Sequence, residues 1–315
     1  MILSASRRTD IPCFYSRWLT ERLKEGRVLV RNPYRYHQVT AYPISPENVD
    51  CIVLWTKNPI PMLEHLHGLS SYTYYFQFTL TGYGRDVEPG LPDKKESLIP
   101  AFKALSREIG PNRLIWRYDP VFFSPRYTPA YHAGAFEQIA SALEGCTSRA
   151  VFSFLDMYRG IEGKMGRLGR REAGKEELLE LSRAFGSSAR AHGMSLETCA
   201  EDLELSEFGI RRGSCVDRAL IEELAGCRMK GGKDRNQRAA CGCMESVDVG
   251  AYGTCGCGCG YCYAGGNWRG GAWDWREPLL GGPLGPEDEV REKYLPSLKE
   301  TQLGLLGLPE SSGPR

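Results

Sequence analysis

Four cysteines lie within eight residues in the stretch Thr254-Cys-Gly-Cys-Gly-Cys-Gly-Tyr-Cys-Tyr263. Three of them, Cys255, Cys259 and Cys262, have the spacing C-x3-C-x2-C, and Tyr261 precedes the last one. Because thiolates are soft ligands, such a loop selects an iron–sulfur cluster or zinc over hard cations. Three thiolates can hold three irons of a cubane cluster and leave the fourth iron open for an exchangeable ligand. The rest of the chain is therefore interpreted as the scaffold and pocket of this loop.

A structural zinc site is the main alternative. Zinc ribbons usually carry two C-x2-C pairs, whereas Cys241 and Cys243 form a C-x-C pair. These two cysteines could still join Cys259 and Cys262 around zinc. The spacing and the density of the thiolates favour iron–sulfur over zinc, with Cys257 as a spare ligand or a bystander. A thiol cluster without any metal is disfavoured, because exposed thiols at this density would oxidise or cross-link.

Four further cysteines could hold an auxiliary cluster. Cys199 ends a predicted strand, and Cys215 begins a predicted helix, whose N-terminus would lower the pKa of the thiol. With Cys241 and Cys243 they would form a second metal site. The alternative is that Cys199 and Cys215 are ordinary small buried residues. The remaining cysteines are interpreted as core or incidental residues: Cys13, Cys51, Cys146 and Cys227.

The charge balance and the N-terminal residues indicate the compartment and the partners. The chain has 40 basic and 39 acidic residues, so only a local patch could attract nucleic acid. No apolar run reaches the length of a membrane span, and the first residues lack the basic-then-apolar layout of a secretion signal. We therefore expect a cytoplasmic protein without a membrane partner. Its 12 cysteines would then serve metal binding rather than disulfides.

Apolar segments that could be buried on both faces alternate with segments of helical periodicity. The predicted strands are residues 2–6, 51–57, 74–80, 113–118, 150–155 and 195–199. The predicted helices are residues 15–25, 96–109, 129–143, 175–192 and 215–224. This alternation predicts an α/β fold with a parallel sheet. About six strand–helix units favour a (β/α) barrel or partial barrel, with an open doubly wound sheet as the alternative.

The composition divides the chain into three parts. Residues 1–226 are the predicted barrel-like domain, and residues 227–264 are a cysteine-rich iron–sulfur segment expected to pack at the barrel mouth. Residues 265–315 are rich in Gly, Pro and Trp and are expected to form a loosely ordered tail with a short helix over 287–299. Three tryptophans could wrap this tail around the body: Trp268, Trp273 and Trp275.

In barrels of this kind, the loops at the carboxyl ends of the strands carry the chemistry. The predicted strand ends are charged and together indicate a binding mouth, although each residue alone could cap a helix or pair with a neighbour. Arg117 and Asp119 are two apart on one strand, so both could face the interior. A buried ion pair is costly there and is often retained for function. The candidate catalytic residues are Arg7, Arg8, Asp10, Lys57, Arg117, Asp119, Glu197 and Glu201.

The loop from Cys255 to Tyr263 resembles the cluster-binding loop of radical S-adenosylmethionine enzymes. Over residues 1–264 the chain resembles the prokaryotic domain-of-unknown-function family 1848, through SASRRTDIP, VLWTKNP, YYFQFTLTGYG, RLIWRYDP, LETCAED, CGCMESVDVGAY and CGYCYA. The resemblance implies that Cys255, Cys259 and Cys262 hold a 4Fe–4S cluster. S-adenosylmethionine would bind the open iron through its amino and carboxylate groups. One-electron reduction would cleave it to a 5′-deoxyadenosyl radical, which abstracts hydrogen from a substrate.

The resemblance also implies partners and ligands. The expected partners are S-adenosylmethionine, an unidentified substrate and an electron donor such as a flavodoxin or ferredoxin. The candidate cofactor-binding residues are Tyr261, Lys57 and Arg117. The chain has no Gly-Gly-Glu run of the kind that usually holds the methionine amino group. Other side chains would bind the carboxylate (Arg7, Arg8, Lys57 or Arg117) and the amino group (Asp10, Asp119 or Glu197).

The position of the loop in the chain is unusual for the radical enzymes. Their cysteine loop usually follows the first strand, whereas here it follows all six predicted units. If residues 246–249 form a barrel strand, the order is a circular permutation that still places the loop at the mouth. Two other functions stay open: a non-radical metalloprotein with a structural zinc or electron-transfer cluster, and a nucleic-acid-handling protein. The latter would use the basic segment 229–238, otherwise a solvated linker, and the tryptophan-rich tail.

Overall fold

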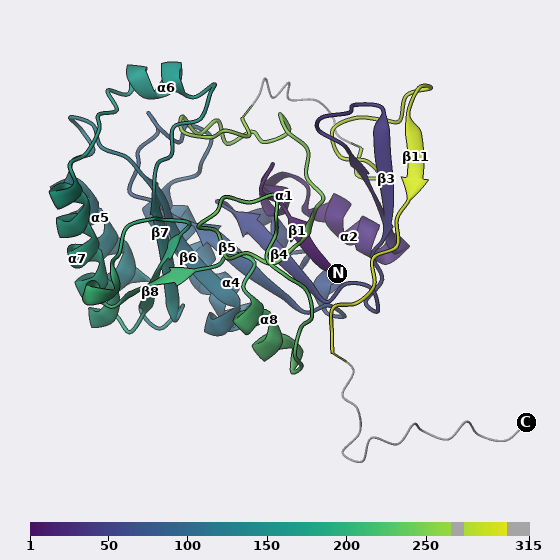
Figure 1. Cartoon of the computed structure of the whole chain (residues 1–315), viewed down its shortest axis with the longest axis horizontal. Coiled ribbons are helices and arrows are strands. Elements are labelled where there is room, and N and C mark those ends of the chain that lie inside the picture. Colours follow the sequence, from purple (N-terminus) through teal and green to yellow (C-terminus); the bar gives the residue numbers. More distant parts are fainter. Residues whose placement is uncertain (266–273, 301–315) are drawn as a thin grey trace, which may run out of the picture.

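The structure is a computed structural model that describes residues 1–265 and 274–300. Within these residues, eight parallel strands form one sheet (Figure 1). In spatial order the strands are β10 (Val247–Asp248), β1 (Ile2–Ala5), β4 (Cys51–Thr56), β5 (Tyr74–Thr79), β6 (Leu114–Val121), β7 (Arg149–Phe154), β8 (Ser195–Cys199) and β9 (Ile210–Gly213). The predicted α/β fold with a parallel sheet is confirmed, and the six predicted strands correspond to β1 and to β4 through β8.

The strand order distinguishes the predicted topologies. From β1 to β9 the order follows the chain and never reverses. A doubly wound sheet reverses its order at a switch point, so that alternative is not observed. No ladder joins the edge strands β9 and β10 in the described part of the chain, so closure into a full barrel is not observed either.

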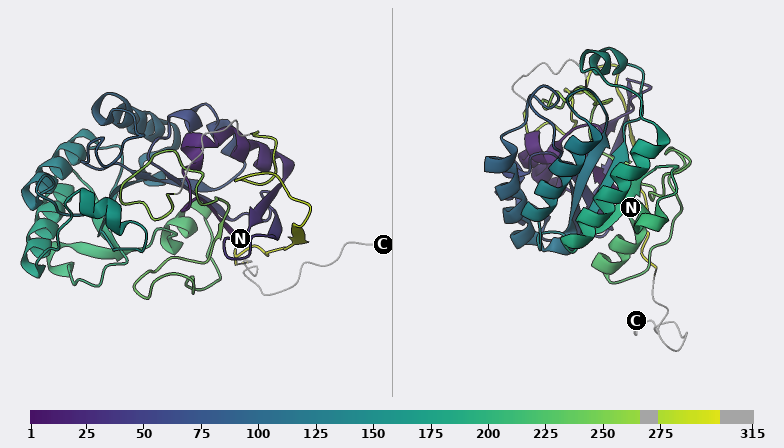
Figure 2. Two further views of the ribbon diagram at one scale, coloured as in Figure 1. Left: turned by 90° about the horizontal axis from the view of Figure 1, so that it is seen from above. Right: turned by 90° about the vertical axis from the view of Figure 1, so that its left-hand side faces the viewer.

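The long helices lie in an arc on one side of the sheet, as the view from above shows (Figure 2). They pack against alternate strand residues such as Ile52, Phe76 and Trp116, which are fully buried. The helices are α1 (Ile11–Phe14), α2 (Ser16–Glu25), α3 (Ile60–Leu63), α4 (Ile99–Ile109), α5 (Pro129–Ala142), α6 (Glu162–Arg167), α7 (Lys175–Ala191) and α8 (Arg218–Ala225). Single turns are η1 (Leu66–Leu69), η2 (Lys94–Leu98), η3 (Pro111–Arg113) and η4 (Ser206–Phe208). In the described residues, no helix combines the length and the apolar character of a membrane span.

The other face of the sheet, called here the inner face, has an apolar half and a polar half. At the amino ends of the strands, Val53, Tyr75 and Ile115 pack with Leu220 and Ile221 of α8. Side chains two residues apart on a strand share a face, so the same face continues toward the carboxyl ends. It carries there Ser4, Trp55, Gln77, Arg117, Ser153 and Cys199. Buried polar groups need partners, so this half of the face is where a site is expected.

A smaller sheet lies beside α2 (Figure 1). In it, β2 (Arg27–Arg31) and β3 (Gln38–Pro43) pair antiparallel, and β11 (Glu289–Glu292) pairs parallel with β3. The predicted helix over 287–299 is therefore wrong. Residues of the tail complete this sheet instead of forming a separate element.

The described part of the tail, residues 274–300, is anchored on the N-terminal helices. The guanidinium of Arg17 lies 3.8 Å from the ring centroid of Trp275. The indole N–H of Trp18 donates a hydrogen bond to the carbonyl of Glu277 (2.7 Å). Of the three tryptophans expected to wrap the body, Trp275 does so, and Trp268 and Trp273 lie outside the described residues.

A strand forms at the segment 246–249, as the permuted order requires. This strand, β10, pairs parallel with β1. The carboxylate of Asp248 fastens the two strands together. It accepts hydrogen bonds from Ser6 Oγ (2.5 Å), the Arg7 backbone N–H (2.7 Å) and Ser4 Oγ (3.1 Å). The strand that leads into the cysteine loop therefore lies beside the first strand of the chain.

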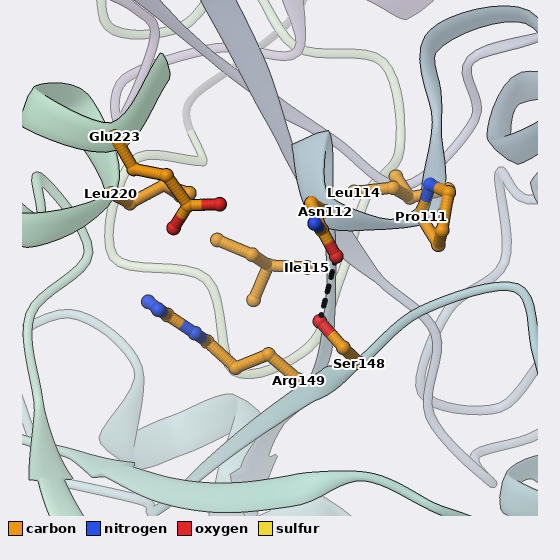
Figure 3. A pocket seen from close by; sticks show the side chains of 8 residues that line it. All are labelled: Pro111, Asn112, Leu114, Ile115, Ser148, Arg149, Leu220 and Glu223. Atoms are coloured by element: carbon orange, nitrogen blue, oxygen red, sulfur yellow. Dashed lines mark hydrogen bonds between the residues drawn. The ribbon is translucent and has the colours of Figure 1, made fainter. Parts of the chain in front are cut away.

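A cavity of about 200 Å³ lies at the amino ends of β6 and β7 (Figure 3). Its walls are Pro111, Asn112, Leu114, Ile115, Ser148, Arg149, Leu220 and Glu223. In it, the hydroxyl of Ser148 donates to the side-chain carbonyl of Asn112 (3.3 Å), and Arg149 pairs with Asp217 at the start of α8. Ligands of parallel α/β sheets bind beyond the carboxyl ends of the strands, so this cavity lies at the opposite end from the expected site.

Candidate functional site

The cysteine loop continues from β10 at the carboxyl end of the sheet. The hydroxyl of Tyr15, between α1 and α2, donates a hydrogen bond to the carbonyl of Thr254 (2.5 Å), just before the first cysteine. Two cysteines of the loop are buried, Cys257 and Cys259, and two are half-buried, Cys255 and Cys262. All four belong to, or pack against, the core between the sheet and the helices. The loop is thus built into the core rather than attached to its surface.

The segment that follows β5 holds the loop from the other side. The backbone N–H of Gly260 donates to the carbonyl of Val87 (2.8 Å), and that of Gly90 donates to the carbonyl of Cys257 (3.0 Å). A Cβ on Gly90 would lie 2.6 Å from the carbonyl oxygen of Gly256 and 2.8 Å from that of Cys257. Only glycine therefore allows this close approach of two backbones.

Replacing Gly90 by alanine is expected to push the cysteine loop away from its support. Overpacking against backbone atoms that cannot yield costs about 1–3 kcal/mol, and we expect the free energy of unfolding to fall by that amount. Denaturant unfolding measures this loss. The control is Gly134→Ala in α5, where an added Cβ meets no atom within 4 Å and raises helix propensity. Equal stability of the two variants would contradict the prediction.

The thiols of the loop contact one another and one cysteine from outside it. The thiol of Cys257 lies close enough to the side chains of Cys255 and of Cys13 in α1 for both to shift its pKa. Cys13, which the sequence interpretation treats as a core or incidental residue, thus adjoins the loop. Burial raises the pKa of Cys259 to about 12, although the nearby Lys57 ammonium opposes this rise. A metal bound here would have to displace the thiol protons.

A buried ionic network adjoins the loop. The ammonium of Lys57 donates to Glu88 Oε1 (2.9 Å) and to the hydroxyl of Tyr261 (2.7 Å). Tyr261 in turn donates to Glu88, and the ammonium of Lys94 pairs with the second oxygen of this carboxylate. Burial would raise the pKa of Glu88, but the two ammonium groups outweigh it and lower the pKa to about 2. The structure thus brings Lys57 and Tyr261 into direct contact and adds two partners, Glu88 and Lys94, that the sequence did not single out.

Arg117 and Asp119 lie on β6 and form an ion pair, with Nη2 and Oδ2 2.5 Å apart. The hydroxyl of Ser153 donates to the other oxygen of Asp119. Burial would raise the pKa of Asp119, but the Arg117 guanidinium outweighs it and the pKa is lowered. The second terminal nitrogen of Arg117 lies 2.9 Å from the sulfur of Cys215. The predicted buried pair therefore stands at the inner face, next to a thiol.

Arg7 and Arg8 form no ion pair in the part of the chain that the structure describes. The guanidinium of Arg7 lies 5.2 Å from the ring centroid of Trp55, and its Nη2 is buried without a hydrogen-bond partner among the described residues. The guanidinium of Arg8 lies 5.4 Å from the ring centroid of Tyr252, in the lead-in to the cysteine loop. Both guanidinium groups are thus placed to receive an anionic ligand at this edge.

Two predicted site residues make their contacts within the fold. Asp10 caps α1 and accepts a hydrogen bond from the backbone N–H of Lys57 (2.7 Å), so both of its oxygens bind backbone. Glu197 lies 3.3 Å from Arg211 and 3.7 Å from Arg149 in a cluster of ion pairs. For both residues the alternative of capping and pairing describes the contacts better than a ligand-binding role.

Glu201 lies beyond β8, beside the inner face. One oxygen of its carboxylate accepts a hydrogen bond from the backbone N–H of Phe154 (2.7 Å). Burial raises the pKa of Glu201 to about 7, and the neighbouring Asp119 and Cys199 add to the rise. Its carboxyl group would therefore change charge near neutral pH.

The four cysteines of the predicted auxiliary site also come together. They are Cys199, Cys215, Cys241 and Cys243, and they lie at the inner face. Cys241 and Cys243 thus belong to a different core cluster from Cys259 and Cys262, so a zinc site made of those four is not formed. In residues 1–265 and 274–300, no three His, Cys, Asp or Glu side chains are arranged to hold a single metal ion.

Comparison with known proteins gives a family. A search of the curated proteins finds no match. A family match spans residues 2–264, which contain all eight strands of the main sheet and both groups of cysteines. The chain therefore belongs to the family described as "Domain of unknown function (DUF1848)".

Proposed function

We propose that the chain is an iron–sulfur enzyme of the radical S-adenosylmethionine type, in which Cys255, Cys259 and Cys262 hold a 4Fe–4S cluster. One observation carries the proposal. The loop follows β10, which lies parallel beside β1, so the C-x3-C-x2-C thiols stand at the carboxyl edge of a parallel sheet. The chemistry that a cluster with one open iron supplies is the reductive cleavage of S-adenosylmethionine.

The side chains around the loop fit such a cluster. The loop offers soft thiolate donors. The ammonium of Lys57 interacts electrostatically with Cys259 and Cys257. A cation in this position would stabilise the negative charge of a thiolate-bound cluster. Positive charge and hydrogen bonds near the sulfurs also tune the potential of iron–sulfur centres. The C-x3-C-x2-C spacing assigns Cys255, Cys259 and Cys262 as the ligand set, and Cys257 adjoins Cys13 outside the loop.

The same edge offers a binding group for the cosubstrate. Lys57 and Arg117 are committed to Glu88 and Asp119, respectively. Arg8 has no ion pair among the described residues and lies over Tyr252, close in sequence to the loop. We therefore assign the methionine carboxylate to Arg8, as a charge-assisted hydrogen bond. The role of Lys57 in this proposal is to hold Tyr261 and the loop in place.

The test is the formation of 5′-deoxyadenosine by anaerobically reconstituted protein, given S-adenosylmethionine and a one-electron reductant. The wild-type chain should form it, and Cys259→Ser should reduce the yield to background because one thiolate ligand is lost. The control is Cys146→Ser, which changes a half-buried cysteine outside both thiol groups and should leave the yield unchanged. A wild-type chain that carries its cluster and never cleaves the cosubstrate would sink the proposal and favour an electron-transfer or structural cluster.

The contacts of the basic segment 229–238 do not favour a nucleic-acid-handling protein. Arg238 pairs with Asp156, and the ammonium of Lys233 donates to the carbonyl of Ala239. Two of its cations are therefore occupied within the chain. Nucleic-acid affinity that falls steeply with added salt would be the sign of the alternative.

A further inference from the structure

The four inner-face cysteines come from three separate segments of the chain. Cys199 ends β8, Cys215 precedes α8, and Cys241 and Cys243 follow α8. The sulfurs of Cys199 and Cys215 are 3.2 Å apart. The side chain of Cys243 also interacts with the side chains of Cys215 and Cys241. The contacts thus join all four thiols into one chain, called here the inner thiol group.

The backbone holds these segments together independently of the thiols. The N–H of Val216 points at the sulfur of Cys243 (3.3 Å), and the N–H of Met244 donates to the carbonyl of Val216 (3.0 Å). The N–H of the buried Asp234 donates to the carbonyl of Cys243 (2.8 Å). Cys215, Cys241 and Cys243 are buried, and Cys199 is half-buried. The inner thiol group is therefore a built feature rather than a chance meeting of surface residues.

Two guanidinium groups face the inner thiol group. Arg117 Nη1 lies 2.9 Å from the sulfur of Cys215. The charges of Cys243 and Cys215 act on Arg7, whose Nη2 is buried and has no partner among the described residues. The ring of Trp55 adjoins both guanidinium groups, with its centroid 5.2 Å from Arg7 and 5.5 Å from Arg117. An unpartnered buried N–H in this position indicates that an anionic acceptor belongs here.

We infer that the inner thiol group is a second iron–sulfur site, with Cys199, Cys215, Cys241 and Cys243 as its four ligands. An all-thiolate set selects iron–sulfur clusters or zinc. Zinc needs four ligands around one point, and among residues 1–265 and 274–300 no three Cys, His, Asp or Glu side chains are placed around such a point. Four thiolates leave no iron open, so this cluster differs from the one proposed at the loop. The guanidinium groups of Arg7 and Arg117 would donate hydrogen bonds to the sulfurs of this second cluster.

The second site is a neighbour of the cysteine loop. Trp55 and Lys57 are two residues apart along β4 and its end, which is about 7 Å of extended chain. Trp55 touches the two arginines of the inner thiol group, and Lys57 touches Tyr261 of the loop. The second site does not rest on the proposed function, because its ligands and its iron can be measured whether or not S-adenosylmethionine is cleaved.

The test is the iron, sulfide and zinc content per chain after anaerobic reconstitution of the full chain with iron and sulfide. The wild-type chain should hold about eight irons, as two 4Fe–4S clusters do. The double variant C241S/C243S should lose about half of this iron, and the loop variant Cys259→Ser should keep the inner half. The control Cys227→Ser, a half-buried cysteine outside both groups, should keep all of it.

Other metal contents overturn the inference. The wild-type chain could hold only about four irons, with all of them lost in Cys259→Ser and kept in C241S/C243S. That result would show that the inner thiol group holds no cluster. About one zinc per chain that only the double variant loses would show a zinc site instead. If the double variant does not fold, the wild-type chain and Cys259→Ser still decide the question. Iron that falls to background in Cys259→Ser, or about one zinc per chain that Cys259→Ser keeps, overturns the inference. Absence of 5′-deoxyadenosine together with eight irons would reject the proposed function and leave the second site intact.

Discussion

Replacing Glu88 by glutamine is expected to lower the free energy of unfolding by about 3–5 kcal/mol at pH 7. The Glu88 carboxylate is buried between the ammonium groups of Lys57 and Lys94, and it accepts a hydrogen bond from Tyr261. Glutamine has nearly the same shape but no charge, so it leaves two half-buried ammonium groups without a counter-charge. Breaking a buried ion pair by removing one partner has costs of this size.

The pH dependence of the same variant tests the cause. Because the pKa of Glu88 is lowered to about 2 in the folded chain, its stabilising effect is complete above its ordinary pKa and is lost as the pH falls toward 2. A protonated Glu88 resembles glutamine, so the stability difference between the wild-type chain and Glu88→Gln should narrow below about pH 4.5. Denaturant unfolding of both proteins between pH 3 and 7 measures this difference in stability. The other titrating groups are the same in both proteins, so their contributions cancel.

A matched control is Glu177→Gln. The carboxylate of Glu177 also has a pKa lowered to about 2, first by its hydrogen bond with Arg171, but this pair is exposed to solvent. Exposed ion pairs are screened and contribute little to stability. We therefore expect Glu177→Gln to change the stability little at any pH. A difference between the wild-type chain and Glu88→Gln that stays constant down to pH 3 would show that packing, not charge, explains the loss.

The interior strands could be predicted from the sequence because each is a continuous apolar run buried on both faces. Cys51–Thr56 is an example, with five of its six residues buried. The two edge strands gave weaker signals. Ile210–Gly213 has two exposed arginines and was missed, and Val247–Asp248 is only two residues long, so it could be named only conditionally. An edge strand has one neighbour and needs no long apolar run.

The polar contacts of the candidate site were harder to predict than the strands. Lys57 and Tyr261 stood out because they adjoin recognisable motifs, but their shared partner Glu88 is 173 residues from Tyr261 in sequence. Asp10 was assigned to the site because it follows a strand, although that position also suits a helix cap. Which carboxylate meets which ammonium depends on how the strands are ordered in the sheet, and no local pattern records that order.

Replacing Asp248 by asparagine is expected to loosen β10 from β1 and to lower the free energy of unfolding by about 2–3 kcal/mol. The carboxylate accepts four hydrogen bonds: from the hydroxyls of Ser4 and Ser6 and from the backbone N–H groups of Arg7 and Gly250. Asparagine keeps one side-chain oxygen and replaces the other with an NH2 group. This group cannot accept a hydrogen bond, so the donors that face it lose their acceptor. Each buried donor left without an acceptor costs about 1–3 kcal/mol.

The position of β10 makes Asp248→Asn informative about both thiol groups. The strand lies between Cys243, which precedes it, and Cys255, which follows it. If its attachment to β1 sets both groups of ligands in place, iron content after reconstitution should fall at both sites together with the stability. Glu245→Gln is the control, because Glu245 is exposed on the same segment and its side chain forms no hydrogen bond in the described residues. If Asp248→Asn is destabilised but binds a normal amount of iron, the clusters hold the loop in place without help from β10. Such a result is possible because a ligand that binds only the folded chain can offset a loss of stability of this size.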